Sequence, residues 1–358
     1  MVGKIYNFAA GPAQLPAPVL KKAQAELMNW HSSGMSVMEM SHRGSLFQEI
    51  HAGAKEKLRS LLSVPSSHEI LFMQGGATGQ FSAVPLNLMG EGPAVYAVTG
   101  NFSGIAAREA AKYGKVLRAF DGGAESYRRI PRQSELKLER GAAYFHYCAN
   151  NTIYGTAWDY VPEAGVPLVC DMSSEILSHP VEVGRYRLIY AGAQKNMAPA
   201  GLTVAIIERA ALGHERPDTP QVLNYRLMSA KDSMLNTPPC WCIYMLGLTL
   251  DWLDEQGGIE GMEQIKHGKA QMLYDCIDSS KLFTCAAEKP FRSDMNVTFR
   301  SASEELDAKF VKEAAEAGFV NLKGHRKVGG MRASIYNAVP VEGVEKLCDF
   351  IRAFDKAN

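Results

Sequence analysis

A glycine-rich turn lies between an apolar run and the expected start of a helix in the first quarter of the chain. The segment 72–81 reads FMQGGATGQF. A turn that opens a helix points free backbone amides and the positive end of the helix dipole at one place, and this geometry binds phosphate. The segment lacks the lysine spacing of nucleotide-hydrolase loops, and glycine turns are common. By itself it therefore favours a plain tight turn over a phosphate site.

Two charged residues follow apolar runs further along the chain. Asp171 ends the run 166–170, at the sheet edge where open α/β sheets hold their ligands. Lys195 comes just after the run 187–190, in a segment that is poor in charge. A lysine removed from water there can lose its proton and act as an amine nucleophile. Taken singly, each residue is more simply interpreted as part of an ion pair or as a solvated loop charge.

The turn, Asp171 and Lys195 fit one cofactor when they are considered together. Pyridoxal phosphate needs a helix N-terminus for its phosphate, a carboxylate for its pyridine nitrogen and an amine for its aldehyde. The chain supplies these three groups in this order along one expected sheet. The sequence therefore predicts a pyridoxal-phosphate site.

The elements that must position these groups follow an α/β pattern. Short apolar runs alternate with helical stretches through the first two thirds of the chain, which indicates a buried, mostly parallel sheet covered by helices. Strands are expected at 69–73, 94–98, 143–147, 166–170, 187–190 and 202–207, and helices at about 19–30, 45–62, 79–89, 103–113 and 239–256.

Gly257 and Gly258 mark an expected domain boundary. The chain has 358 residues, which suits about two domains. We expect a large cofactor-binding domain over 1–257 and a smaller α+β domain over 258–358, with the site in the crevice between them. The second domain should contain a helix after the boundary, strand 295–299, helix 304–317, strand 331–336 and helix 341–356.

Composition and charge argue against several classes of protein. The 38 Lys and Arg balance the 38 Asp and Glu, so no broad positive field exists for nucleic acid or an anionic membrane. No apolar stretch approaches the roughly 18 residues of a membrane helix, and the N-terminus lacks a signal-peptide pattern. The seven scattered cysteines predict free thiols, and Cys240 and Cys242 lack a second pair at zinc spacing. We expect a cytoplasmic protein with small-molecule partners and no metal.

Several segments in both expected domains resemble the phosphoserine aminotransferase family of the fold-type I, class V aminotransferases, and the resemblance runs nearly end to end. It implies a large α/β/α domain with a mostly parallel sheet of the seven-stranded type, and a smaller C-terminal α+β domain. The N-terminal segment of about 15 residues could pack on the smaller domain. The matching segments are 7–12 (NFAAGP), 41–44 (SHRG), 74–81 with 85–87, 151–152 (NT), 192–196 (GAQKN), 236–239 (NTPP), 323–326 (KGHR) and 329–338.

The resemblance implies a role for each residue that would hold the cofactor. Lys195 would bond covalently to the cofactor aldehyde, and Asp171 would pair with the pyridine nitrogen. Asn236 and Thr237 would reach the phosphate from the neighbouring subunit, which implies a homodimer with shared sites. The other cofactor contacts would be Ala77, Thr78 and Gln194 at the phosphate, Thr152 beside the ring hydroxyl and Phe102 stacked on the ring.

The resemblance also implies a basic substrate pocket. Arg332 would hold the α-carboxylate of the substrate, a task that suits a planar guanidinium. The second anionic group of the substrate would be surrounded by Ser41, His42, Arg43, His325 and Arg326. Without the resemblance, His42 and the triplet 325–327 would be interpreted as ordinary surface charges.

Two positions differ from patterns common in the family. Many members carry tryptophan in place of Phe102, so the same stacking is expected with a smaller face and no indole donor. Some members carry arginine in place of Thr78. Recognition of a substrate phosphate should therefore depend more on the histidines and arginines of the pocket.

The implied reaction transfers the amino group of L-glutamate to 3-phosphohydroxypyruvate, giving O-phospho-L-serine and 2-oxoglutarate in serine biosynthesis. The alternative is another class V aminotransferase, of the alanine–glyoxylate or serine–pyruvate type, which does not need the basic pairs His42–Arg43 and His325–Arg326. A cysteine desulfurase would usually carry histidine at the position where this chain has Gln194. A regulator on this fold would normally add a DNA-binding domain, and the charge balance argues against nucleic acid.

Overall fold

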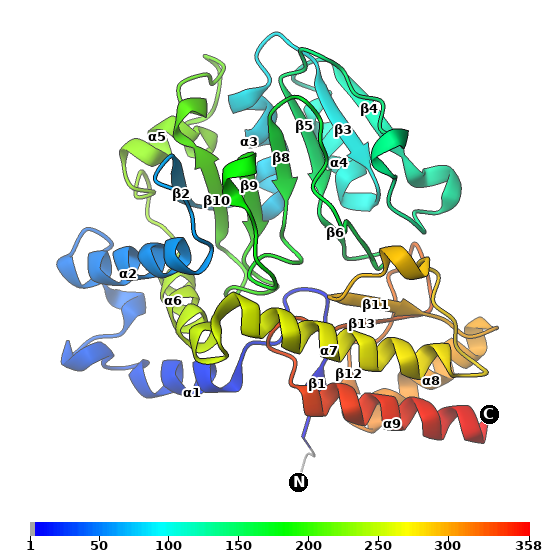
Figure 1. Cartoon of the computed structure of the whole chain (residues 1–358). Helices are drawn as coiled ribbons and strands as arrows, with labels where there is room; N and C mark the ends of the chain where they lie inside the picture. Colours follow the sequence, from blue (N-terminus) through cyan, green and yellow to red (C-terminus); the bar gives the residue numbers. More distant parts are fainter. Residues whose placement is uncertain (1–3) are drawn as a thin grey trace.

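The computed structural model describes residues 4–358 and shows an α/β architecture built on one large sheet (Figure 1). The sheet has seven strands in the order β2-β10-β9-β8-β5-β3-β4. Neighbouring strands are parallel, except that β10 runs antiparallel to both β2 and β9. The predicted fold class is confirmed. The strands are β2 (His68–Met73), β3 (Ala94–Val98), β4 (Val116–Asp121), β5 (Tyr144–Cys148), β8 (Leu168–Asp171), β9 (Tyr186–Gly192) and β10 (Thr203–Glu208).

Four strands of the sheet are buried along their whole length because both faces of the sheet are covered. Every residue of β2, β3, β5 and β8 is buried. Side chains alternate between the faces of a strand. In β2, Ile70 and Phe72 pack into one hydrophobic cluster, whereas Leu71 and Met73 pack into another.

Helices cover both faces of this sheet. Leu58 of α2 and Ile243 of α6 belong to the same cluster as Phe72, whereas Phe81 of α3 and Ala106 of α4 belong to the cluster on the other face. The helices of this part of the chain are α1 (Ala17–Glu26), α2 (Ser45–Leu61), α3 (Gly76–Leu88), α4 (Asn101–Ala110), α5 (Tyr225–Ala230) and α6 (Cys240–Glu255).

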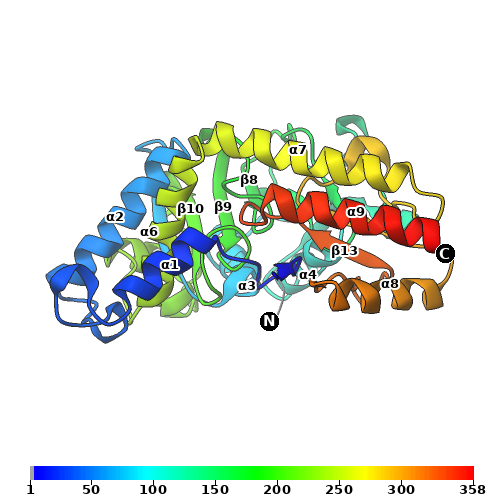
Figure 2. The same ribbon diagram turned by 90° about the horizontal axis from the view of Figure 1, so that it is seen from below.

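A third hydrophobic cluster forms the core of the C-terminal part of the chain, which lies below the sheet in Figure 1. Figure 2 shows its helices α7 and α9 running alongside each other. Strands β11 and β13 pair antiparallel within it. Its elements are α7 (Gly258–Asp278), β11 (Asn296–Phe299), α8 (Glu304–Glu316), β12 (Phe319–Val320), β13 (Met331–Ser334) and α9 (Val341–Ala357).

The N-terminal segment joins this C-terminal core. Strand β1 (Tyr6–Asn7) pairs parallel with β12. Tyr6 and Phe8 belong to the same hydrophobic cluster as Ile351 of α9. The division of the chain into two domains after residue 257 stays a prediction. Residues 1–3 of the N-terminal segment lie outside the described residues.

The structure differs from the sequence prediction at several elements, among them the short strands β1 and β12. Strand β4 was not expected, because it is a half-buried edge strand that carries Arg118 and Asp121 as an ion pair. The short helix α5 was not expected either. Helix α1 ends at Glu26 rather than near residue 30, since Trp30–Ser32 forms a 3-10 turn in which His31 has a φ of 45°.

No helix within residues 4–358 is long and apolar enough to cross a membrane. The seven cysteines are free thiols.

Candidate active site

Lys195 follows β9 on a tight turn and points its amine at the end of a neighbouring hairpin. Its Nζ donates a hydrogen bond to Thr152 Oγ1 at 2.7 Å. Burial lowers the pKa of the Lys195 ammonium to about 8, against the opposing charge of Asp171. A lowered pKa leaves more of the amine neutral near neutral pH, which is the form that acts as a nucleophile or base.

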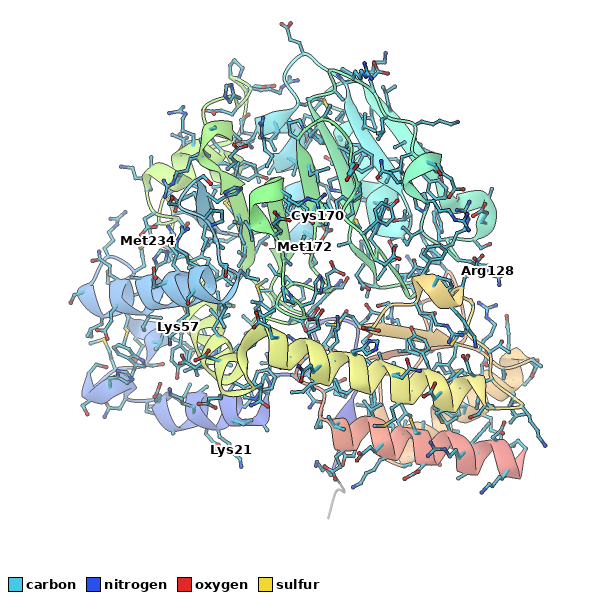
Figure 3. The ribbon with its side chains drawn as sticks, in the orientation of Figure 1. Lys21, Lys57, Arg128, Cys170, Met172 and Met234 are labelled. Carbon is cyan, nitrogen blue, oxygen red and sulfur yellow. The ribbon has the colours of Figure 1, made fainter. Side chains whose placement is uncertain are left out.

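Asp171 is the last residue of β8 and lies opposite Tyr190 of β9 and Cys148 of β5 in the sheet register. Only 6% of Asp171 is exposed. Figure 3 labels its chain neighbours, Cys170 and Met172, in the middle of the molecule.

Burial raises the pKa of the Asp171 carboxyl above its ordinary value, although the hydrogen bonds of Ser173 and the charge of Lys195 act in the opposite direction. Ser173 N–H donates to its Oδ1 at 2.9 Å, and Cys148 Sγ donates to its Oδ2 at 3.9 Å. A further positive group beside Asp171 would favour the ionised carboxylate.

The glycine-rich turn does open a helix. Gly75 and Gly76 have φ values of 90° and 63°, a left-handed conformation that glycine adopts without strain. The first backbone hydrogen bond of α3 runs from Gly79 N–H to Gly75 O at 3.0 Å. In the described chain the N–H groups of Ala77 and Thr78 have no acceptor, so they are free to meet an anion.

The first turn of α4 places an aromatic ring beside the lysine. Gly100 comes directly before α4, and a Cβ at this residue would collide with Asn151 Oδ1. This close approach brings Phe102 near the site, with its ring centroid 5.6 Å from Lys195 Nζ. Phe102 is 38% exposed, unlike most large apolar residues in the described chain. It therefore presents a free face on which a flat ring could stack.

The hairpin that carries Thr152 is fixed by buried amide contacts. It consists of β6 (Asn150–Asn151) and β7 (Thr156–Ala157). Asn151 Nδ2 donates to Thr99 Oγ1 at 3.3 Å and to Thr156 Oγ1 at 3.1 Å. Thr152 is thereby held between the lysine and the C-terminal part of the chain.

Arg332 reaches the same place from β13. Its Nη1 donates to Thr152 O at 3.3 Å, and burial lowers the pKa of its guanidinium from the ordinary value. Burial also lowers the pKa of His325, and the positive charges of Arg332 and Arg326 lower it further. The electrostatic effect of Arg332 on His325 indicates that the two residues lie in one basic neighbourhood.

The N-terminal segment passes along the lysine turn. Ala13 N–H donates to Gln194 O at 2.8 Å, and Tyr336 OH donates to Ala10 O at 2.9 Å. A Cβ at Gly11 would lie 3.5 Å from Lys195 Cγ. This segment therefore lines the aliphatic part of Lys195.

Five of the expected site residues are not joined to this group. His42 Nε2 is buried without a hydrogen-bond partner among residues 4–358, and Ser41 and Arg43 are exposed. No hydrogen bond or ion pair in this part of the chain connects these three to Lys195 or Arg332. Asn236 and Thr237 are also exposed, and Thr237 O accepts a hydrogen bond from Gln74 at the glycine-rich turn.

The structure adds site residues that the sequence did not reveal. Cys148 and Ser173 contact the Asp171 carboxylate. Lys327 Nζ donates to Asn101 Oδ1 across the site. The position of Cys148 at the end of an apolar strand was a usable signal, because that strand ends beside the one that carries Asp171.

The chemistry of this donor set fits pyridoxal phosphate. The free amides of α3 suit a phosphate, the buried Asp171 suits a protonated pyridine nitrogen, and the exposed face of Phe102 suits the flat ring. Lys195 supplies an amine of lowered pKa beside them.

Residues 5–347 match the family described as aminotransferase class-V. The chain is 51% identical to a phosphoserine aminotransferase of Laribacter hongkongensis over 356 residues, which cover 99% of each chain. A solved phosphoserine aminotransferase from Bacillus circulans subsp. alkalophilus is 44% identical over 99% of both chains, with a TM-score of 0.97. A phosphoserine aminotransferase from Trichomonas vaginalis with bound pyridoxal phosphate is 38% identical over 98% of this chain and 100% of that one, with a TM-score of 0.94.

Proposed function

The chain belongs to the class V aminotransferase family, and from this premise we propose that it transfers the amino group of L-glutamate to 3-phosphohydroxypyruvate, giving O-phospho-L-serine and 2-oxoglutarate in serine biosynthesis. It is a transaminase that uses pyridoxal phosphate. The observation that carries the site assignment is the half-buried Lys195, whose amine contacts Thr152 near Asp171 and Phe102.

When bound, pyridoxal phosphate supplies an aldehyde that exchanges amino groups and a ring that accepts electrons from the substrate Cα. Lys195 Nζ, as a neutral amine, removes the proton from Cα of glutamate. In the second half reaction Lys195 Nζ, in its protonated form, delivers a proton to C2 of 3-phosphohydroxypyruvate. Asp171 would pair with the pyridine nitrogen of the bound cofactor, and its carboxylate would hold the proton on that nitrogen.

Arg332 orients the substrate. Its guanidinium stands beside Thr152, next to the lysine, and can take the α-carboxylate through two parallel hydrogen bonds. Thr152 Oγ1 holds Lys195 Nζ on the same side. The proton carrier and the carboxylate clamp are therefore positioned by one short hairpin.

We assign recognition of the substrate phosphate to Ser41, His42, Arg43, His325 and Arg326. Arg43 and Arg326 are exposed and make no ion pair within the described residues, so their side chains are available to a ligand. Aminotransferases of the alanine–glyoxylate or serine–pyruvate type do not need this basic set. High similarity to phosphoserine aminotransferases over the whole chain favours the phosphorylated substrate.

The double variant Arg43→Ala, Arg326→Ala should lose activity selectively with O-phosphoserine. Each charge-assisted hydrogen bond to a phosphate contributes about 1.5–3 kcal/mol. Removing two should raise the barrier by about 3–6 kcal/mol, or lower kcat/KM by about 10²- to 10⁴-fold. Single-turnover titrations with O-phosphoserine and with serine measure the effect, and serine should be affected much less.

The exposed Arg140, which has no hydrogen bond or ion pair in residues 4–358, provides the matched control as Arg140→Ala. This variant should keep the wild-type preference. Equal losses with both substrates in the double variant would mean that the arginines do not recognise phosphate. The alternative class V activity would then be favoured.

We also propose that the enzyme is a cytoplasmic homodimer whose subunits share their active sites. Two observations support the dimer. Asn236 and Thr237 are exposed and can therefore reach a second copy of the chain, and His42 carries a buried nitrogen without a partner among the described residues. The free thiols are compatible with a reducing compartment.

Mixing two inactive variants should restore activity if Asn236 and Thr237 serve the neighbouring site. A mixed dimer contains one Lys195→Ala chain and one Asn236→Ala, Thr237→Ala chain. One of its two sites carries none of these substitutions. Random exchange of equal amounts should then give about a quarter of the wild-type activity, because half of the dimers are mixed and each has one intact site.

The matched control replaces the second chain with one that carries Lys195→Ala as well as the other two changes, and it should restore nothing. Subunit exchange is verified with differently tagged chains. Mixed dimers that form without any gain in activity would show that each site is built within one chain.

A further inference from the structure

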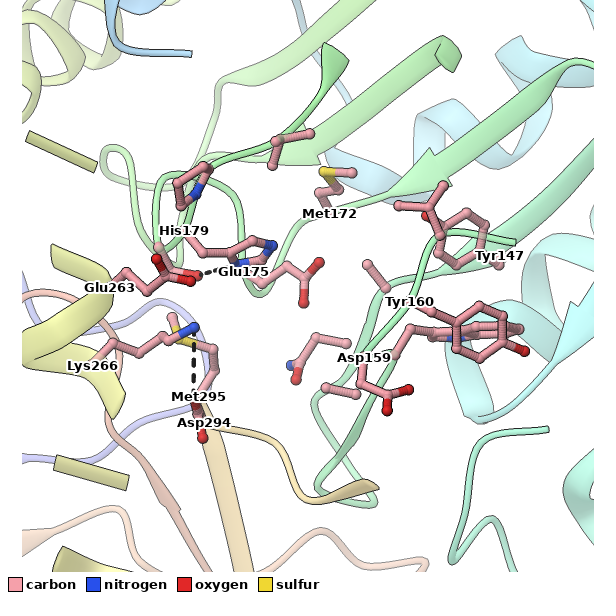
Figure 4. Close-up of a pocket in the computed structure, with 18 of the residues that line it drawn as sticks. Tyr147, Asp159, Tyr160, Met172, Glu175, His179, Glu263, Lys266, Asp294 and Met295 are labelled. Carbon is pink, nitrogen blue, oxygen red and sulfur yellow. Dashed lines mark hydrogen bonds and ion pairs between the residues drawn. The ribbon is translucent and has the colours of Figure 1, made fainter. Parts of the chain in front are cut away.

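A second cavity, of about 390 Å³, lies between the sheet and α7 (Figure 4). Its lining contains none of Lys195, Asp171, Thr152 and Arg332. One wall comes from segments of the sheet region between residues 147 and 186, and the other from α7 and residues 290–295. The volume is within the range of small-molecule sites, about 300–1,000 Å³.

Glu175 lines this cavity, and its carboxylate has no partner among the described residues. Only 8% of the residue is exposed, and no hydrogen bond or ion pair from any described residue reaches its carboxylate. Figure 4 shows its side chain extending into the open middle of the cavity. Burial raises the pKa of Glu175 to about 7, and Asp171 and Asp294 add to this effect while Lys266 opposes it. A buried carboxylate without a partner is costly, so the position calls for a cation.

The cations in the wall are already engaged. Lys266 Nζ lies 3.6 Å from Asp294 Oδ2. Arg292 donates two hydrogen bonds to Asp278, at 2.8 and 2.9 Å. Burial lowers the pKa of His179 to about 4, so this ring is neutral at pH 7.

Three further acids, Asp159, Glu182 and Glu263, line the cavity, and within residues 4–358 none of them makes an ion pair. The wall therefore carries an excess of negative charge. Anions are repelled, and a zwitterion would find no free cation for its carboxylate.

Three aromatic side chains, Tyr147, Trp158 and Tyr160, line the same cavity as the acids. The ring centroids of Tyr147 and Trp158 are 5.0 Å apart, and those of Trp158 and Tyr160 are 5.2 Å apart. Aromatic faces attract cations, and alkylated ammonium groups are the ligands that aromatic walls bind best. Among the described residues no three His, Cys, Asp or Glu side chains are grouped to hold a metal ion. The geometry therefore suits an organic cation better than an inorganic one.

We propose that this cavity is a second binding site, separate from the active site, for a small organic cation of the alkylated-ammonium class. Its charge lies against the Glu175 carboxylate, and its methyl groups lie against Tyr147, Trp158 and Tyr160. The bound cation touches both the sheet region and α7. It also contacts the turn that follows Asp171, because Glu175 N–H is hydrogen-bonded to Met172 O at 3.0 Å.

Calorimetric titration of the holoenzyme with choline tests the site. Choline is a quaternary ammonium and cannot react with the cofactor aldehyde, and 3,3-dimethylbutan-1-ol is its uncharged isostere. We expect one choline per chain and at least about tenfold weaker binding of the alcohol. Glu175→Gln should weaken choline binding at least about tenfold, and Asp159→Asn should weaken it by a smaller factor.

Glu260→Gln is the matched control, because Glu260 is an exposed acid of α7 outside the cavity. It should bind choline as the wild type does. Saturating O-phosphoserine should leave choline binding unchanged, whereas displacement would place choline in the active site and overturn the proposal. Equal binding of choline and the alcohol, unchanged binding after Glu175→Gln in a variant whose circular dichroism matches the wild type, or no binding at about 10 mM choline would also overturn it.

Discussion

Lys195→Ala should reduce transamination by at least about 10⁴-fold, because one change removes both the nucleophilic amine and the proton carrier. The fold should persist, since the side chain ends in a single hydrogen bond to Thr152. The free amides of α3 and Asp171 remain, so the variant should still bind pyridoxal phosphate, now removable by dialysis. Steady-state rates, circular dichroism and cofactor absorbance before and after dialysis measure these effects.

Lys21→Ala is the control, because Lys21 is an exposed lysine of α1 with no ion pair in residues 4–358. It should keep wild-type activity. A small added amine such as methylamine should restore part of the activity of Lys195→Ala by replacing the missing base. Wild-type turnover by Lys195→Ala would remove Lys195 from the proposed site.

Asp171→Asn should lower kcat by about 10²- to 10³-fold or more, the range found when one preorganised electrostatic partner is removed. The amide has the same shape as the carboxylate but cannot hold a positive ring nitrogen. Both half reactions pass through the same ring, so the rates with glutamate and with O-phosphoserine should fall by the same factor. Stopped-flow measurement of each half reaction tests this.

The equal loss of rate with the two substrates distinguishes Asp171 from the arginines of the pocket. Removal of the arginines should lower the rates with the two substrates by different factors. Asp218→Asn removes an exposed carboxylate that pairs with Arg216 and should leave both rates unchanged. Wild-type rates in Asp171→Asn with the cofactor bound would exclude the assigned role.

The central part of the site could be predicted because its residues directly follow buried strands. Asp171 ends an apolar run, and the run before Lys195 is equally clear. Parallel strands end at one edge of a sheet, so these two residues had to lie close together. The order of strands in the sheet, and hence the neighbours of Asp171, depends on long-range pairing that a local pattern does not contain.

Contacts made by irregular segments were harder to predict. The pair formed by Lys327 and Asn101 joins residues more than two hundred positions apart, and neither residue has a neighbour that signals the other. Strand β4 was missed because its exposed face carries Arg118 and Asp121, which weakens the apolar signal. Thr152 and Arg332 were assigned only through family resemblance, since a lone threonine or arginine does not indicate its partner.

The pairing of β1 with β12 affects how the protein is made. A ribosome releases Tyr6 and Phe8 more than three hundred residues before their hydrophobic partners Phe319 and Ile351. The sheet region can form its own contacts during translation. The C-terminal core is complete only when Tyr6 and Phe8 pack against the residues of that core. A fragment beginning at residue 258 would lack two of its own core aromatics.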